Sequence, residues 1–521
     1  MTRAASVTRS AASLLTSRLT VAVIALVFLG VSTRLLSLQE MAVFAVYNTL
    51  CGLLTVVCSL GLLAACIKIL PGMMAAPGDS AERGEAIRLL RLSVMVYVLG
   101  AATVVTAIWF AAEPISRLLL KTPDRAADVR AAALTAFCYG LYEASQLLLS
   151  ALQRFGRVGG YNVAAALIQR LLSLLLFFTF GLKGYLAGFA LGSLIGAGLG
   201  FATFLPLLRG SRSSGSFPPG RTSAGWIAWS MPFYADGYLR YLYMHADQLL
   251  VGIFLSPADL SIYFVAKRSI QYCQVLVSSF IDPLGTKIAE LRGSDPAAVA
   301  RAFATSLRYF ILLFVPFAAL LACLSPFLLL MIGGARYGSA AVPLALLFLS
   351  LPFYAVFSHL STFSYALGQP KERLLSDLVS ALAQTGAVVA LMPALALTGL
   401  ALARAVGFGV AALFTWRRVI RYLPGAGSQG RRAPSGALRA ALQSAGPTAM
   451  MAVMILLPHR LIGRPSLMPL YAVPATAACL IACLVMVLNS ADRNALMAMM
   501  PGQGRAARLA RRVLMMRTTA K

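Results

Sequence analysis

Five long stretches of this chain contain no charged side chain, namely 41–67, 92–112, 184–208, 309–335 and 465–491. A helix needs about 20 apolar residues to cross the hydrocarbon core of a bilayer, so each stretch is long enough to span a membrane. Apolar segments that carry isolated charges add further predicted helices near 14–36, 131–152, 160–181, 226–254, 261–288, 341–366, 374–395, 399–420 and 438–460. The sequence therefore predicts an all-α integral membrane protein with about 14 transmembrane helices.

The charge balance is strongly basic, with 45 Lys and Arg against 17 Asp and Glu, a formal net charge of +28. Such a balance in a soluble protein would suggest a nucleic-acid partner. Here only 12% of the residues are charged and 59% are hydrophobic, so we expect membrane lipids as partners and no nucleic acid. Most basic residues share one side when both termini are cytoplasmic, which is the orientation that the positive-inside rule predicts. The basic segments 417–439 and 505–521 then act as topology determinants and contact anionic lipid.

Residues for catalysis are not recognisable in the sequence. It shows no Ser-His-Asp set and no glycine-rich phosphate loop, and its 3 histidines and 8 cysteines form no metal-ligand pattern. We therefore expect a protein that is not an enzyme, with no catalytic residues, no metal site and no cofactor.

Two pairs of segments repeat along the chain. Residues 36–46 match 255–265 at an offset of 219, and 184–192 match 399–407 at an offset of 215. Equal direction and nearly equal offset predict two pseudo-symmetric six-helix lobes followed by two C-terminal helices. The predicted domains are an N-terminal lobe (1–210), a cytoplasmic linker (211–225), a C-terminal lobe (226–421), a basic cytoplasmic linker (422–437), helices 13 and 14 (438–488) and a basic cytoplasmic tail (489–521).

The predicted seventh and eighth helices carry a pattern that resembles a known family. It runs Asp247-x-x-Leu250-x-Gly252-x-Phe254-Leu255-Ser256-x-x-x-Leu260-x-x-Tyr263-x-x-Ala266-x-Arg268, followed by Pro283. It is similar to bacterial polysaccharide flippases of the O-antigen type, in the multidrug/oligosaccharidyl-lipid/polysaccharide exporter superfamily. Three further segments resemble the same family, namely Arg34-x-Leu36-Ser37-x-x-Glu40-x-x-x-Phe44, Ala151-Leu152-Gln153-Arg154-x-Gly156-Arg157 and Ala366-Leu367-Gly368-Gln369. The chain departs from the family at Ser261 and Ile262, where a glycine often precedes the tyrosine.

Ionisable residues inside predicted spans are functional candidates, because each is costly unless it faces protein or water. Asp236, Arg240, Tyr243 and Asp247 share one face of the seventh helix. A polar stripe on the eighth helix consists of Tyr263, Lys267, Gln271, Gln274 and Ser278, with the repeat counterparts Phe44, Asn48, Gly52, Thr55 and Ser59. The predicted substrate-binding residues are Arg34, Asn48, Arg170, Arg240, Lys267, Arg268, Gln271, Gln274 and Arg404, and the predicted coupling or ion-pair residues are Glu143, Asp236 and Asp247.

Several of these residues allow two interpretations. Asp236 either pairs with Arg240 at i, i+4 or carries a proton, and Glu143 either pairs with Arg170 or takes part in coupling. Arg34 either extends to the interface or points into a cavity. We expect Lys267 and Arg268 to have no neighbouring acid, and the interior as a whole leans cationic, which suits an anionic head group.

The resemblance implies a transporter that flips a polyprenyl-pyrophosphate-linked oligosaccharide from the inner to the outer leaflet of the bacterial inner membrane. It implies alternating access between two lobes, a role in polysaccharide biosynthesis, and a polysaccharide polymerase and glycosyltransferases as further partners. The nearest alternative is a cation-coupled multidrug exporter of the same fold, which would prefer a cavity lined by carboxylates. A membrane-embedded polymerase or glycosyltransferase would need a long external loop or an acidic metal-binding motif, and the sequence shows neither.

Overall fold

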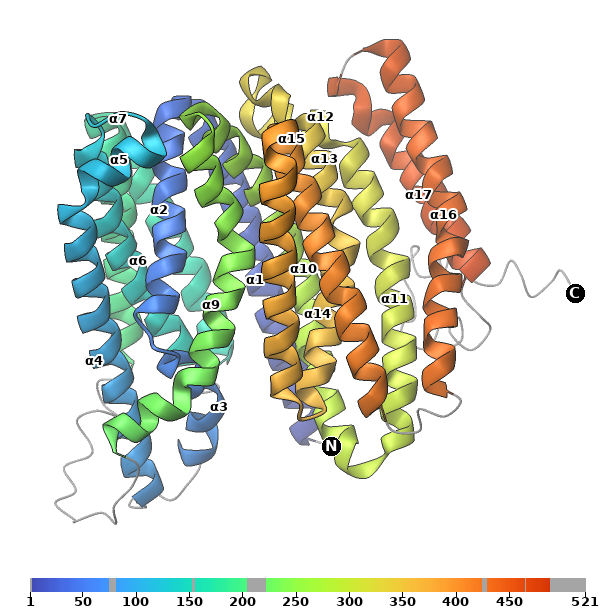
Figure 1. The fold of residues 1–521 in the computed structure, drawn as a ribbon, viewed down its shortest axis with the longest axis horizontal. Coiled ribbons are helices and arrows are strands. Elements are labelled where there is room, and N and C mark those ends of the chain that lie inside the picture. Colours follow the sequence, from blue (N-terminus) through green and yellow to red (C-terminus); the bar gives the residue numbers. More distant parts are fainter. Residues whose placement is uncertain are drawn as a thin grey trace, which may run out of the picture. The chain divides into compact units, whose positions relative to one another are not determined.

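The structure of this chain is a computed structural model that describes residues 2–74, 81–151, 155–203, 222–423, 429–463 and 465–487. Within these ranges the regular structure is helical, and seven segments are long and apolar enough to cross a membrane (Figure 1). The predicted all-α membrane fold is confirmed. Most of the predicted linker 211–225, part of the linker 422–437 and the whole basic tail 489–521 lie outside the described residues.

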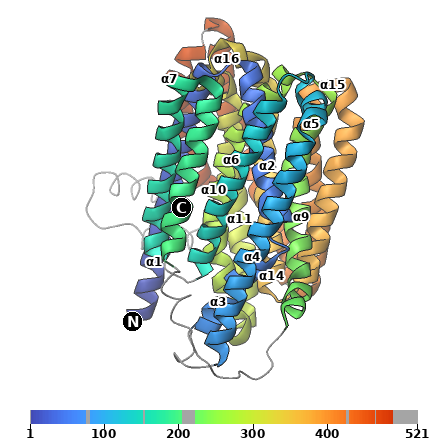
Figure 2. The ribbon, with the colours of Figure 1, turned by 90° about the vertical axis from the view of Figure 1, so that its left-hand side faces the viewer.

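The chain divides into two compact units, Met1–Ser279 (unit 1) and Phe280–Lys521 (unit 2). The helices of unit 1 are α1 (Thr2–Leu35), α2 (Leu38–Val57), α3 (Leu62–Met74), α4 (Ala81–Phe110), α5 (Ala112–Leu120), α6 (Ala126–Ala151), α7 (Phe155–Ala202) and α9 (Ser223–Phe254). Helix α10 (Pro257–Ser294) begins in unit 1 and ends in unit 2. Figure 2 shows α6 between α4 and α7, both of which it contacts. The predicted lobe boundaries, 1–210 and 226–421, remain a prediction.

Unit 2 continues with α11 (Pro296–Cys323), α12 (Ser325–Gly333), a 3-10 helix η1 (Ala335–Ala340), α13 (Ala341–Leu349), α14 (Leu351–Ala366), α15 (Pro370–Tyr422), α16 (Gln429–Ile462), a 3-10 helix η2 (Pro465–Leu467) and α17 (Met468–Val487). The two C-terminal helices α16 and α17 lie side by side (Figure 1). Their shared core joins Met451 and Ile455 of α16 to Met468 and Ala472 of α17, together with Cys323 at the end of α11.

The longest helices, α7 and α15, are each a hairpin of two predicted spans. The backbone reverses at Gly181 (φ 60°) in α7 and at Ala396 (φ 46°) in α15, 215 residues later. Past each reversal a glycine meets the preceding segment so closely that a side chain would collide with a backbone carbonyl. The contact joins Gly184 to Leu176 in α7 and Gly399 to Leu391 in α15, again at an offset of 215. The repeat predicted from the glycine pattern is therefore a repeat of backbone packing.

The second repeated pattern marks two helix N-termini. Ser37 caps α2 by accepting a bond from the Glu40 amide, while the Glu40 carboxylate accepts one from the Ser37 amide. Ser256 and Asp259 form the same reciprocal pair before α10, at an offset of 219. Such a capping box satisfies amides that have no partner inside the helix. The short link between two antiparallel helices is thus fixed in the same way in both repeats.

Candidate functional site

The predicted polar face of α9 divides into an exposed half and a buried half. Near its middle, the Arg240 guanidinium lies 3.4 Å from the Asp236 carboxylate, and these side chains are 47% and 27% exposed. One and two turns later, respectively, Tyr243 and Asp247 are buried. The i, i+4 pair is present as one of the two interpretations predicts, and the deeper charge on this helix is Asp247.

Asp247 forms a buried three-residue cluster with α10. The Lys267 ammonium donates to Asp247 Oδ1 at 2.6 Å, and the Tyr263 hydroxyl donates to Asp247 Oδ2 at 2.6 Å. The Lys267 and Asp247 side chains are only 1% and 0% exposed. A carboxylate withdrawn from water needs such charged and hydrogen-bonding partners, because its desolvation is costly. Both oxygens of this carboxylate are therefore held by α10.

The expectation that Lys267 lacks an acidic neighbour is wrong. Its acid lies on the preceding helix, across the short link between α9 and α10. Asp247 and Lys267 stand at similar distances from that link along antiparallel helices, so their similar depth was readable from the sequence. The rotation of each helix about its axis, which decides whether the two side chains face each other, could not be read from the sequence.

Arg268, the residue after Lys267, has neutral hydrogen-bond partners. Its guanidinium donates to Asn48 Oδ1 of α2 at 2.5 Å and to Gln271 Oε1 of α10 at 2.8 Å, and it lies over the Phe264 ring. Among the residues that the structure describes, Arg268 forms no ion pair. Two predicted site residues, Asn48 and Gln271, thus hold a third, Arg268, whose contacts among the described residues are uncharged.

The Glu143–Arg170 pair does not form. Glu143 accepts a bond from the Tyr139 hydroxyl one turn earlier on α6, at 2.7 Å. Arg170 donates instead to the Ala166 carbonyl at 2.9 Å and lies over the Phe28 ring. Tyr139 was missed as a partner, although its i, i+4 spacing from Glu143 was visible in the sequence.

The other predicted site residues have surroundings of their own. Arg34 is exposed in the last turn of α1, and Gln274 is buried one turn beyond Gln271 on α10. In unit 2, Arg404 is fully buried within the α15 hairpin and lies over the Phe408 ring. The structure therefore does not gather all the predicted cations at one place within unit 1.

A set of bonds that the sequence did not reveal joins α9 to α2. Three side chains of α9 donate to backbone carbonyls of α2 and of the turn after it. Gln248 reaches Ala45 at 2.8 Å, Tyr241 reaches Thr49 at 3.3 Å, and Ser230 reaches Leu60 at 2.7 Å. These bonds join α9 to α2 between Ala45 and the turn after the helix, in the same unit as the charged cluster.

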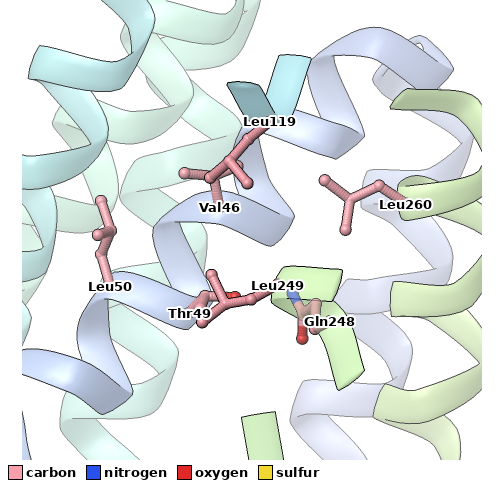
Figure 3. Close-up of a pocket in the computed structure, with 7 residues that line it drawn as sticks. All are labelled: Val46, Thr49, Leu50, Leu119, Gln248, Leu249 and Leu260. Carbon is pink, nitrogen blue, oxygen red and sulfur yellow. The ribbon is translucent and has the colours of Figure 1, made fainter. Parts of the chain in front are cut away.

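A small pocket opens beside this contact (Figure 3). Its lining consists of Val46, Thr49, Leu50, Leu119, Gln248, Leu249 and Leu260, from α2, α5, α9 and α10. Because these side chains are apolar apart from Thr49 and Gln248, the pocket suits an apolar group. The charged residues that could hold an anionic head group lie outside its lining.

The fold and these buried charges define a class, the multi-pass helical membrane transporters. Residues 31–342 match the family model described as polysaccharide biosynthesis protein, and because this is more than half of the chain, the chain belongs to that family. Residues 254–471 also match the model of the lipid II flippase MurJ. No curated protein matches the sequence significantly.

Solved structures of transporters share the fold. The lipid II flippase MurJ in an inward closed conformation has a TM-score of 0.71 and 14% identity, over 91% of this chain and 98% of that one. A multidrug resistance MATE family transporter of the MOP superfamily, in an inward-facing conformation, has a TM-score of 0.63 and 14% identity, over 79% and 98%. A MOP superfamily transporter from Pyrococcus furiosus has a TM-score of 0.59 and 13% identity, over 79% and 96%. The multidrug/oligosaccharidyl-lipid/polysaccharide exporter fold predicted from the sequence is confirmed.

Proposed function

We propose that this chain flips a polyprenyl-pyrophosphate-linked oligosaccharide from the inner to the outer leaflet of the bacterial inner membrane, for polysaccharide biosynthesis. Membership of the polysaccharide biosynthesis protein family and the fold shared with the lipid II flippase MurJ support the substrate class. Both termini are cytoplasmic in this proposal, and a polymerase and glycosyltransferases act on the same saccharide. Alternating access moves the head group across while the lipid tail stays in the bilayer.

The observation that carries the proposal is the Arg268 guanidinium. A guanidinium keeps its charge when desolvated and binds phosphate oxygens through two parallel bonds. Arg268 is partly buried and rests on two amide side chains, Asn48 and Gln271, which place its charge without neutralising it. A pyrophosphate that replaces these weaker partners supplies the missing negative charge. Outward movement of each negative charge also gains roughly 2.3 kcal/mol per 100 mV of membrane potential.

The test is flipping of a polyprenyl-pyrophosphate-linked sugar in proteoliposomes that contain the full chain. Arg268→Gln removes the charge but keeps an amide, and we expect at least a tenfold loss of flipping. Arg268→Lys restores the charge without the two-bond geometry and should recover activity only in part. The matched control is Arg117→Gln, because Arg117 is an exposed arginine paired with Glu113 on α5. Equal flipping by Arg268→Gln and the control would remove Arg268 from the mechanism.

The alternative, a cation-coupled multidrug exporter, is separated by the same proteoliposomes. Ethidium and similar cationic dyes would be exported against a proton or sodium gradient, and the loss of Arg268 would leave that export unchanged or increase it. Dye export without lipid flipping would replace the proposed function by this one.

A further inference from the structure

The Asp247–Lys267 ion pair occupies a position that the other repeat fills with uncharged residues. At the offset of 219, Asp247, Tyr263 and Lys267 correspond to Phe28, Phe44 and Asn48. The register is the same, because α1 ends at Leu35 and α9 at Phe254, each followed by a capping box.

Phe28 and Phe44 belong to a compact aromatic cluster in the first repeat. Both rings are buried and lie against Tyr185 and Phe189. The fold therefore accepts an aromatic ring at the place of Asp247 and an uncharged amide, Asn48, at the place of Lys267. A buried ion pair is seldom more stable than well-packed hydrophobic residues of similar size. Stability alone does not account for the pair, so its charges are better explained by function.

Lys267 and Arg268 are consecutive residues of α10, yet their charges are in different states. The Lys267 ammonium is bound to Asp247, while Arg268 contacts neutral amides. The lysine side chain is a flexible stem of four carbons with a compact charge at its end, so its ammonium can change partners without movement of the backbone. An anion bound at Arg268 competes with Asp247 for this ammonium.

We propose that Asp247 makes the site selective for diphosphate over monophosphate lipids, because it releases Lys267 only to the more highly charged ligand. This inference rests on the proposed function and deepens it. A monophosphate binds Arg268 alone, since a single phosphate gains too little from Lys267 to offset a carboxylate left buried without its cation. A diphosphate spans both cations and takes the ammonium from Asp247, which keeps the Tyr263 hydroxyl.

The exchange also connects substrate binding to helix movement. The Lys267 ammonium and the Tyr263 hydroxyl of α10 both donate to the Asp247 carboxylate of α9. When the Lys267 ammonium leaves Asp247, the attachment of α10 to α9 is weakened. The hydrogen bonds from Gln248 and Tyr241 of α9 to α2 do not involve the substrate. Only a diphosphate therefore loosens α10 from its neighbour.

The experiment compares binding of farnesyl diphosphate and farnesyl monophosphate to the detergent-solubilised full chain by calorimetry. The wild type should prefer the diphosphate by about tenfold or more. In Asp247→Asn, Lys267 is available to either ligand, so monophosphate binding should tighten by about tenfold and the preference should shrink. In Lys267→Met, the preference should shrink because diphosphate binding weakens. The double variant Asp247→Asn with Lys267→Met should behave as Lys267→Met does, because Asp247 acts through the ammonium.

Two results would overturn the inference while leaving the proposed function intact. One is an unchanged preference in Asp247→Asn when Arg268→Gln weakens binding of both ligands. The other is equal tightening by Asp247→Asn with and without Lys267, which would mean that Asp247 acts only through its long-range field. If neither ligand binds the wild type, or if Arg268→Gln binds both as the wild type does, the proposed function fails as well.

A second variant covers the case in which a single substitution prevents folding. The triple variant Asp247→Phe, Tyr263→Phe and Lys267→Asn copies the residues of the first repeat, where they pack without an ion pair. We expect it to fold, to bind the monophosphate as the wild type does, and to lose the diphosphate preference. A triple variant that folds and retains the preference would contradict the inference.

Discussion

The Arg418 guanidinium donates to both carboxylate oxygens of Glu372 across the α15 hairpin. Its Nε lies 2.6 Å from Oε2 and one terminal nitrogen lies 2.8 Å from Oε1. Tyr422 donates a third bond to Oε1 at 2.9 Å. Glu372 lies in the first turn of α15, and Arg418 and Tyr422 lie in its last turns. A paired, charge-assisted contact of this kind is both stronger and more directional than a single bond. It closes the open end of the hairpin that reverses at Ala396.

Loss of this clamp should lower the thermal stability of unit 2. We expect Glu372→Gln to reduce the melting temperature of the detergent-solubilised chain, because the amide offers only one acceptor and no charge to Arg418. The matched control is Glu113→Gln, which removes an exposed i, i+4 pair with Arg117 and should have a smaller effect. Equal shifts for the two variants would show that the clamp contributes nothing specific.

The close helix packing in the α15 hairpin predicts that alanine substitutions at two of its glycines have different effects on stability. A side chain at Gly407 would meet the Gln384 side chain at 2.6 Å, whereas one at Gly386 of the same hairpin would meet nothing within 4 Å. Gly407→Ala should therefore destabilise the chain by about 1–3 kcal/mol through overpacking. Gly386→Ala should leave stability unchanged or raise it by up to about 1 kcal/mol, because alanine favours helix. Thermal melts of the two variants measure the difference, and a loss at both positions would contradict the packing argument.

Features that depend on local spacing were predictable from the sequence. The glycines of α7 and α15 and the Ser-x-x-Glu and Ser-x-x-Asp pairs were visible as repeats, and the structure shows their physical causes in close backbone approach and in helix capping. Both effects involve neighbours within one hairpin or one helical turn. Composition and span length then determined the fold class.

Features that depend on helix rotation were not predictable. Arg268 donates to Asn48, which lies 220 residues earlier in the chain. Lys267 pairs with Asp247 only because the faces of α9 and α10 that carry these residues point toward each other. The sequence placed Asp247, Lys267 and Asn48 on polar stripes, and Arg268 next to Lys267, but could not say which stripes meet. For the same reason the bonds from Gln248 and Tyr241 to backbone carbonyls of α2 could not be predicted, since any carbonyl of a facing helix is an equivalent acceptor.

The predicted orientation can be measured with reporter fusions. Alkaline phosphatase is active only outside the cytoplasm, and green fluorescent protein, when exported through the general secretory pathway, fluoresces only inside. Fusions after residues 215 and 430 should fluoresce and lack phosphatase activity, and fusions after residues 183 and 336 should show the reverse. The paired reporters control for expression at each site. Phosphatase activity after residue 215 or 430 would reverse the orientation expected from the positive-inside rule.

The last prediction concerns Asp236, which is either a partner of Arg240 or a proton carrier. The pair is long, at 3.4 Å, and its two side chains are 47% and 27% exposed, so water screens much of its attraction. Asp236→Asn should therefore lower stability by only about 0.2–1 kcal/mol, the range of exposed pairs.

If Asp236 serves only Arg240, flipping by this variant should keep the pH dependence of the wild type. A proton carrier predicts a stable protein whose flipping no longer responds to a pH gradient, because the amide imitates the protonated carboxyl at every pH. Melting curves and flipping rates of Asp236→Asn in proteoliposomes at two external pH values decide between the two, with Glu113→Gln as the control for loss of an exposed acid. We expect the pH dependence to survive, because the acid withdrawn from water on this helix is Asp247, whereas the Asp236 side chain is 27% exposed.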